Sequence, residues 1–210
     1  MIRLPDRVPK RITIACSGGS DSMVAIDFFL RGKKDIRVAH FDHKTQHSEF
    51  ARAFVEKFCK DRDLDLVVGE LNAEKEKGQS PEEFWRTHRL DWLPSLDGSV
   101  ATGHHLDDAV EWWMFTSMNG IGRLIPYRNK NIIRPLLLTK KSIIERWISR
   151  NNIPHVKDPS NLDVKYARNR IRCNLMPEIL KINPGIHKVV RKKIESQIKF
   201  EKKMMEMPVC

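Results

Sequence analysis

Short apolar runs alternate with amphipathic segments along the first 118 residues. The apolar runs fall at residues 12–16, 36–41, 64–68 and 100–102, and the segments with helical periodicity fall at residues 21–31, 48–62, 80–93 and 107–118. Apolar strands that alternate with helices form parallel sheets covered on both faces. We therefore expect an α/β fold with a twisted parallel sheet and helices on both faces, whose ligands bind at the carboxyl ends of the strands.

The first of these helices follows a turn of small and hydroxyl residues. The turn comprises Ser17, Gly18, Gly19, Ser20, Asp21 and Ser22. Such a turn exposes backbone N–H groups beside a helix N-terminus, so it suits a phosphate group. It lacks the lysine of the Walker A sequence and the spacing of the dinucleotide fingerprint, so neither of those sites is expected.

A second candidate site follows the expected strand at residues 100–102. The sequence GHHLDDAVE places Asp107, Asp108 and Glu111 near the start of a helix, where their carboxylates can share one face. They can hold Mg²⁺ on a nucleotide or pair with a cationic substrate, whereas ordinary helix capping is the alternative. Because both strand exits face the same edge of the sheet, the two motifs are expected to meet one ligand.

The pattern changes after residue 122. A strand is expected at residues 132–137, followed by helices at residues 139–150, at residues 166–175 and after residue 185. Residues 1–122 carry a net charge of −3, whereas residues 123–210 carry +14. We expect a catalytic domain over residues 1–138 and a small basic helical extension over residues 139–210. The extension suits a polyanion such as nucleic acid, although lysine-rich helices also occur as plain solvated surfaces.

Two further segments carry arginines at helical spacing. Arg86 and Arg89 lie three apart in a helix with an expected capping box at Ser80, and such a pair can grip a phosphate or a carboxylate or stay solvated. Residues 158–172 begin with a polar turn and continue into a basic helix with an aromatic residue. Arginines for phosphates and a ring for a base are typical of RNA recognition. The candidate residues are Tyr166, Arg168, Asn169, Arg170 and Arg172.

Together these motifs resemble the tRNA(Ile)-lysidine synthetases, a family of PP-loop ATP pyrophosphatases. The resemblance rests on SGGSDS at residues 17–22, HHLDD at residues 104–108 with Glu111, RPLL at residues 134–137 and DPSNLDVKYARNRIR at residues 158–172. The loop is typical of the superfamily, and the long run is typical of this family. The resemblance implies a PP-loop fold like that of the adenine nucleotide alpha hydrolases.

The resemblance also implies an activity. Members use ATP to adenylate the carbon 2 oxygen of the wobble cytidine in a tRNA(Ile) with a CAU anticodon, and the ε-amine of free L-lysine then displaces AMP to leave lysidine. The implied cofactors are ATP and Mg²⁺, and the implied partners are the tRNA and lysine. The implied roles are ATP binding by residues 17–22 with His40 and His43; metal binding by Asp21, Asp107 and Asp108; catalysis by Asp21, Arg86, Asp108 and Glu111; and tRNA binding by Tyr166, Arg168, Asn169, Arg170 and Arg172.

The chain departs from the family in two respects. Ala109-Val110 follows Asp108 where members commonly carry Gln-Ala, which leaves the acidic positions intact. Many members continue into a further C-terminal domain that engages the tRNA acceptor stem, and we expect this chain to be a short form without it. Discrimination between tRNAs is therefore expected to be weaker.

Two other functions remain open. A PP-loop tRNA thiolase commonly relays sulfur through paired cysteines, whereas Cys16, Cys59, Cys173 and Cys210 are widely spaced. A non-catalytic tRNA-binding protein would gain nothing from carboxylates that face RNA. No apolar run suits a membrane helix or a signal peptide, so we expect a cytoplasmic protein without membrane contact. The oligomeric state is left open, with a homodimer as one alternative.

Overall fold

The computed structural model describes residues 1–157 and 164–206, and its centre is a sheet with the strand order β3-β2-β1-β4-β6-β5. All neighbouring strands run parallel except β5 and β6. The expected α/β fold is confirmed. The strands are β1 (Arg11–Ala15), β2 (Asp35–Asp42), β3 (Asp65–Glu70), β4 (Val100–Ala101), β5 (Arg128–Asn129) and β6 (Ile132–Ile133).

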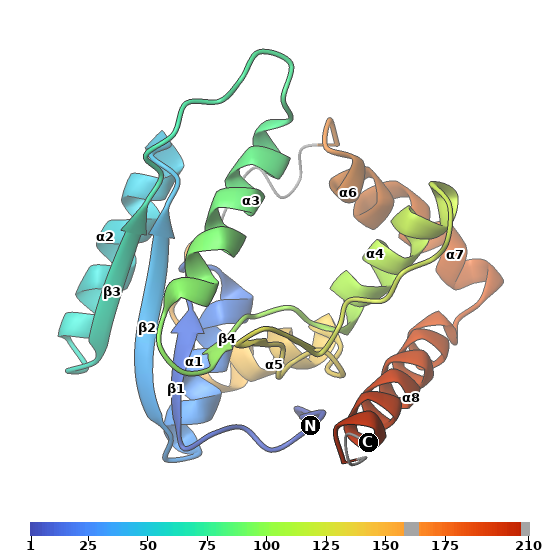
Figure 1. The fold of residues 1–210 in the computed structure, drawn as a ribbon, viewed down its shortest axis with the longest axis horizontal. Coiled ribbons are helices and arrows are strands. Elements are labelled where there is room, and N and C mark those ends of the chain that lie inside the picture. The colour runs from blue at the N-terminus through green and yellow to red at the C-terminus, as the bar shows by residue number, and fades with distance from the viewer. Residues whose placement is uncertain (158–163, 207–210) are drawn as a thin grey trace.

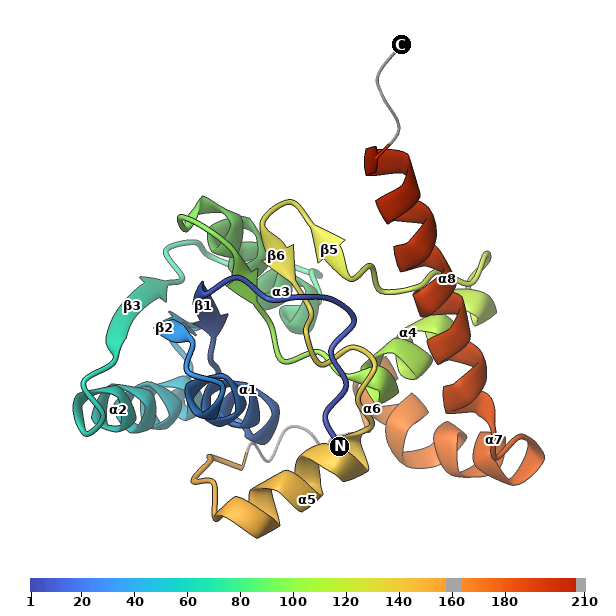
Figure 2. The same ribbon diagram turned by 90° about the horizontal axis from the view of Figure 1, so that it is seen from below.

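Helices connect the strands and continue beyond them (Figure 1). They are α1 (Ser20–Arg31), α2 (Gln46–Lys60), α3 (Pro81–Trp92), α4 (Leu106–Met118), α5 (Lys141–Asn151), α6 (Ala167–Arg170), α7 (Met176–Ile182) and α8 (Ile186–Glu206), with a 3₁₀ turn at Leu93–Ser95 and a π turn at Ile171–Leu175. Figure 2 shows α1 and α2 on one face of the sheet and α3 on the other. Helices α4, α6, α7 and α8 gather at one side, where α8 packs along α4. No helix within the two described ranges is both long and apolar enough to cross a bilayer.

The central strand is covered on both faces. Ile12, Thr13 and Ile14 are all buried, which is typical of a parallel strand between two layers of helices. The hydrophobic cluster that contains Ile14 also contains Ile144 of α5 and Ile194 of α8. Both sides of the expected boundary at residue 138 thus contribute to one core, and the division into two domains stays a prediction.

The order of the strands reverses between β1 and β4. The chain runs outward from β1 through β2 to β3, and then returns through α3 to pair β4 with the other side of β1. A crevice forms where neighbouring connections leave in opposite directions, and ligands bind there in open α/β sheets. The residues that follow β1 and β4 therefore stand at the expected ligand edge.

The strand expected at residues 132–137 is only two residues long. After Ile133 the backbone turns twice: the Leu137 N–H donates to the Arg134 carbonyl at 3.1 Å, and the Thr139 N–H donates to the Leu136 carbonyl at 2.8 Å. Leu136 and Leu137 are fully buried. The apolar run thus reflects a buried turn, which pattern alone does not distinguish from a strand.

The basic helix expected to end at residue 175 continues past Pro177. The helical path runs through α6, the π turn and α7, and Pro177 stands in the first turn of α7. A proline has no N–H and its ring crowds the preceding turn, so a wider π turn before it keeps the chain helical. The polar turn expected at residues 158–161 lies outside the described residues.

Candidate active site

The turn of residues 17–19 joins β1 to α1 at the reversal of strand order. Gly18 has φ +77°, where any side chain would strain the backbone. Its carbonyl accepts a hydrogen bond from the Val156 N–H at 2.9 Å, and the Ser22 hydroxyl donates to the Gly19 carbonyl at 2.9 Å. The first N–H groups of a helix have no acceptor within the helix. The first turn of α1 therefore presents N–H groups at the carboxyl end of β1, in the arrangement that binds phosphate.

Lys141, the first residue of α5, links this loop to the acidic motif. Its ammonium donates to the Ser20 hydroxyl at 2.9 Å and to the Asp21 carboxylate at 2.5 Å. Its backbone N–H donates to the Asp107 carboxylate at 2.7 Å. Sequence reasoning missed this lysine because it belongs to no motif. The signal that could have found it is its place two residues after the buried turn of residues 134–139, which begins with RPLL.

The GHHLDD segment packs directly on the start of α1. A Cβ on Gly103 would lie 3.1 Å from the Ser22 nitrogen, tighter than ordinary contacts. His105 caps α4, since its N–H donates to the Asp108 carboxylate at 2.9 Å and its Nδ1 accepts from the Asp108 N–H at 3.3 Å. Its Nε2 lies 3.7 Å from a carboxylate oxygen of Asp21. The exits of β1 and β4 thus meet at His105.

Asp107 is fastened to the C-terminal helix. The buried His187 of α8 places Nε2 3.0 Å from a carboxylate oxygen of Asp107. Burial alone would raise the pKa of Asp107, but the hydrogen bonds from His187 and Lys141 outweigh it and hold the pKa below its usual value. Asp107 therefore stays ionised and ties α8 to the edge of the sheet.

Asp108 and Glu111 are paired with two arginines from beyond the sheet. Arg168 lies 2.7 Å from Asp108 and 3.4 Å from Glu111. Arg172 donates twice to Glu111, from Nε and Nη2 at 2.8 Å each, and lies 3.3 Å from Asp108. Burial alone would raise the pKa of Asp108, but His105 and Arg168 outweigh it and hold the pKa far below its usual value. The two carboxylates of α4 and the two arginines of α6 and the π turn thus form a charge-balanced cluster.

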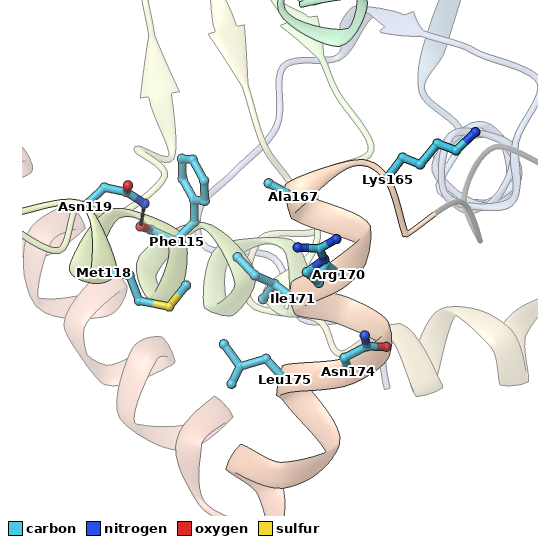
Figure 3. Close-up of a pocket in the computed structure, with 9 residues that line it drawn as sticks. All are labelled: Phe115, Met118, Asn119, Lys165, Ala167, Arg170, Ile171, Asn174 and Leu175. Atoms are coloured by element: carbon cyan, nitrogen blue, oxygen red, sulfur yellow. Dashed lines mark hydrogen bonds between the residues drawn. The ribbon is translucent and has the colours of Figure 1, made fainter.

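The five residues expected to bind tRNA face different ways. Arg168 and Arg172 point into the acidic cluster, Asn169 is buried, and Tyr166 is half-buried at the start of α6. Arg170 is exposed. It lines a shallow groove of about 580 Å³ with apolar side chains of α4 and the π turn, among them Phe115, Met118 and Ile171 (Figure 3). The assignment of these five residues to tRNA stays a prediction.

His40 and His43 stand at the end of β2 and just after it, beside the exit of β1. The Nδ1 of His40 lies 2.9 Å from the Cys16 carbonyl, and its buried Nε2 has no partner among the described residues. Burial lowers the pKa of both rings, that of His43 to about 4. Neutral rings suit a nucleoside better than a phosphate, and ATP binding by these histidines stays a prediction.

Arg86 projects from α3. Its guanidinium lies 5.1 Å from the centre of the Trp112 ring, within the range of a cation–π contact. Ser80 precedes α3 and Pro81 is its first residue, as expected. The Ser80 side chain makes no capping hydrogen bond, so the expected capping box is wrong.

Asp21 fits a magnesium ion on a nucleotide better than the other acids do. Within the described ranges, no three His, Cys, Asp or Glu side chains converge as a complete metal site. Mg²⁺ on a triphosphate needs only one or two carboxylates, since phosphate oxygens and water supply the other ligands. The Asp21 side chain is 33% exposed beside the loop, whereas only 11% of Asp108 is exposed. Metal binding by Asp107 and Asp108 stays a prediction.

Comparison with known proteins assigns the chain to a family. A model of the PP-loop domain matches residues 3–179. The tRNA(Ile)-lysidine synthases of Thermotoga maritima and Persephonella marina are 32% and 33% identical over 199 and 195 residues, which is 86% and 84% of this chain but 48% and 43% of those proteins. The chain therefore spans about half the length of the curated relatives it matches. The NH3-dependent NAD synthetase from Campylobacter jejuni shares the fold, with a TM-score of 0.50 and 13% identity over 98% of this chain and 91% of that one. With most of its length matched, and with the loop and acidic motif meeting at one sheet edge, this chain belongs to the PP-loop domain family.

Proposed function

We propose that this chain converts the wobble cytidine of tRNA(Ile) with a CAU anticodon to lysidine. ATP adenylates the carbon 2 oxygen of the base with release of pyrophosphate, and the ε-amine of free lysine then displaces AMP. The relatives named tRNA(Ile)-lysidine synthase support the proposal. The observation that carries it is the meeting of the phosphate loop with the acidic motif, where His105 lies within 3.7 Å of Asp21 and caps the helix of Asp108. A reaction that releases pyrophosphate and admits a cationic amine needs both groups at one place.

On the ATP side, the loop and Lys141 hold the departing pyrophosphate. The N–H groups at the start of α1 bind its oxygens, and Lys141 exchanges its contact with Asp21 for a phosphate. Asp21 is then free to hold Mg²⁺, which when bound neutralises charge on the pyrophosphate. Arg86 stabilises charge that develops during adenylation.

On the lysine side, Asp108 and Glu111 receive the amine. A lysine ammonium carries the same charge as one of the guanidiniums that now face these carboxylates, so it can take the place of one arginine without leaving a buried charge unpaired. The low pKa of Asp108 makes it a poor base. Its part is therefore to bind and orient the amine, which gives up a proton to water before its neutral form attacks.

The basic segment after residue 122 receives the tRNA. Its net charge of +14 suits a polyanion, and Arg170 already faces solvent. One of Arg168 and Arg172 can turn to an RNA phosphate once a substrate amine has taken its place at the carboxylates. This function also agrees with a location in the cytoplasm.

The test is a complete reaction with purified protein, CAU-anticodon tRNA, ATP with Mg²⁺, and labelled lysine. We expect equal amounts of AMP and tRNA-bound label, both lost in Asp21→Asn and both kept in Asp61→Asn, whose side chain lies on the surface after α2. AMP that appears only with a sulfur donor would establish a thiolase instead. Tight tRNA binding without any AMP would establish a binding protein.

A further inference from the structure

A second pocket, of about 250 Å³, adjoins the acidic site through His104. It lies between α3, α4 and the segment that leads to β5 and β6. Four arginines line it, together with His104 and Trp112, and we call it the arginine pocket: Arg86, Arg89, Arg123 and Arg134. Within the part of the chain that the structure describes, no carboxylate lines this pocket.

Among the described residues, no acid lines the base of the arginine pocket, where Arg89 and Arg134 lie. Arg134 is only 7% exposed; it donates from Nη1 to the Pro126 carbonyl at 2.8 Å, while its buried Nε has no partner in the described part of the chain. Burial lowers the pKa of Arg134 to about 10, and the nearby Arg86 contributes. Burial also lowers the pKa of Arg89 to about 10, with further contributions from Arg86 and Arg168. A buried guanidinium such as that of Arg134 is costly unless an anion pairs with it, so this pocket suits an oxyanion.

The distribution of the arginines points to a polymeric anion. Arg86 and Arg123 are exposed, Arg89 is half-buried and Arg134 is buried. Positive charge therefore extends from the protein surface to the bottom of the pocket. This distribution suits a nucleic-acid strand that crosses the pocket entrance and places one phosphate inside. A single free carboxylate would meet only the buried end.

The position of the pocket separates it from the phosphates of ATP. The loop of residues 17–19 follows β1, whereas the arginine pocket adjoins the residues that follow β4, where the Thr102 hydroxyl lies 2.8 Å from the His104 ring. The next residue is His105, which caps the helix of Asp108. A ligand in the arginine pocket is thus a neighbour of whatever group enters the acidic site.

We propose that the arginine pocket binds a backbone phosphate of the RNA substrate, adjacent to the nucleotide whose base enters the acidic site. This inference rests on the proposed function, because it takes the polymer to be tRNA. It assigns Arg89 and Arg134 to positioning the strand rather than to bond formation.

The test measures binding of a CAU anticodon stem-loop RNA without ATP or lysine. In Arg89→Gln we expect affinity to fall about tenfold, as for loss of one hydrogen bond to a charged group. The slope of log affinity against log salt should fall in magnitude by about 0.7, the value for one phosphate of a single strand. Arg89→Lys should restore the slope. Arg11→Gln changes an exposed arginine at the amino end of β1, away from the basic segment, and should change neither quantity.

A methylphosphonate scan of the same RNA then locates the phosphate. In the wild-type protein one neutral linkage beside the wobble nucleotide should weaken binding about tenfold, and in Arg89→Gln that linkage should cost nothing further. If every linkage behaves alike in the two proteins, the pocket does not bind RNA. A raised KM for lysine with unchanged RNA binding would assign the pocket to the carboxylate of the amino acid and overturn the proposal.

Two controls keep the outcomes separate. Thermal unfolding shows whether Arg89→Gln folds, and the exposed Arg123→Gln provides a second variant of the same pocket. The scan needs no turnover. If the protein modifies tRNA but Arg89→Gln does not change the cost of the neutral linkage, only this inference is wrong. If Arg89→Gln removes the cost of that linkage but the protein forms no lysidine, only the proposed reaction is wrong.

Discussion

The Arg172 guanidinium grips the Glu111 carboxylate through two nitrogens, each 2.8 Å from an oxygen. Paired hydrogen bonds between these planar groups are stronger and more specific than a single contact. The pair joins the basic segment to the helix that carries the acidic motif, and only 4% of the Glu111 side chain is exposed. In the proposed reaction a substrate amine competes with this arginine, so the resting site holds a cation of the protein's own.

Loss of this pair should destabilise the fold. Among the described residues, Arg172→Ala leaves Glu111 with only the longer contact to Arg168. We expect a loss of about 1 kcal/mol in the free energy of unfolding, low in the usual range because a third of Arg172 is exposed. Urea unfolding measures it, with Arg150→Ala as the control. A double-mutant cycle with Glu111→Gln should show coupling of about 1 kcal/mol. Strictly additive effects would mean that the pair is not formed in solution.

Lys141→Ala should weaken ATP binding. The Lys141 ammonium contacts Ser20 and Asp21, and we assign it to binding the pyrophosphate. Its loss should therefore raise the KM for ATP about tenfold and leave the KM for lysine unchanged. Lys141→Arg should recover part of the affinity. The neighbouring Lys140→Ala, whose side chain is exposed, is the matched control. An unchanged KM for ATP in Lys141→Ala would remove the lysine from the phosphate site.

His187→Ala should loosen α8. It removes the partner of Asp107 and leaves a carboxylate oxygen unsatisfied, for a cost of about 1–3 kcal/mol in the free energy of unfolding. His187→Gln keeps a donor and should lose less. Amide hydrogen exchange should rise in α8 of His187→Ala before it rises in the strands. Equal stability of the two variants would show that packing, not the hydrogen bond, matters at this position.

Stability should fall as the pH is lowered, because of His104. Burial lowers the pKa of this ring to about 3 from an ordinary value of 6.5, so the unfolded chain takes up a proton that the folded chain refuses. The contribution of the neutral His104 ring to the free energy of unfolding is therefore complete above pH 6.5. It is lost progressively as the pH falls toward about 3. Between about pH 7.5 and about pH 5 we expect a loss of about 2 kcal/mol from this residue. In urea unfolding, the stability of His104→Gln should change with pH by about 2 kcal/mol less than that of the wild type. An equal change in both proteins would show that His104 is not the cause.

Local pattern was sufficient for the parallel strands β1 to β4 and for the positions of both motifs, but it did not predict β5. β-branched runs such as that of β1 and the small-residue turn after it have few alternatives, because a strand between two helical layers must be apolar along its whole length. The same reasoning failed at residues 134–137, since a buried turn is as apolar as a buried strand.

Pattern could not show which charges pair. Arg168 and Arg172 looked like a surface for RNA, but they face carboxylates that lie about 60 positions earlier in the chain. Composition is the same for a solvated arginine and for a paired one. Lys141 illustrates the limit again, because its contact with Asp21 depends on how α5 docks against α1.

The π turn at Ile171–Leu175 makes this part of the chain sensitive to its length. A π turn holds more residues than an α-helical turn, and each residue of an α-helix rotates the following side chains by about 100°. Deletion of one residue there would leave Arg168 at the carboxylates while α7 turned away from its packing partners. Insertions and deletions in this turn should therefore be far less tolerated than substitutions on its exposed side.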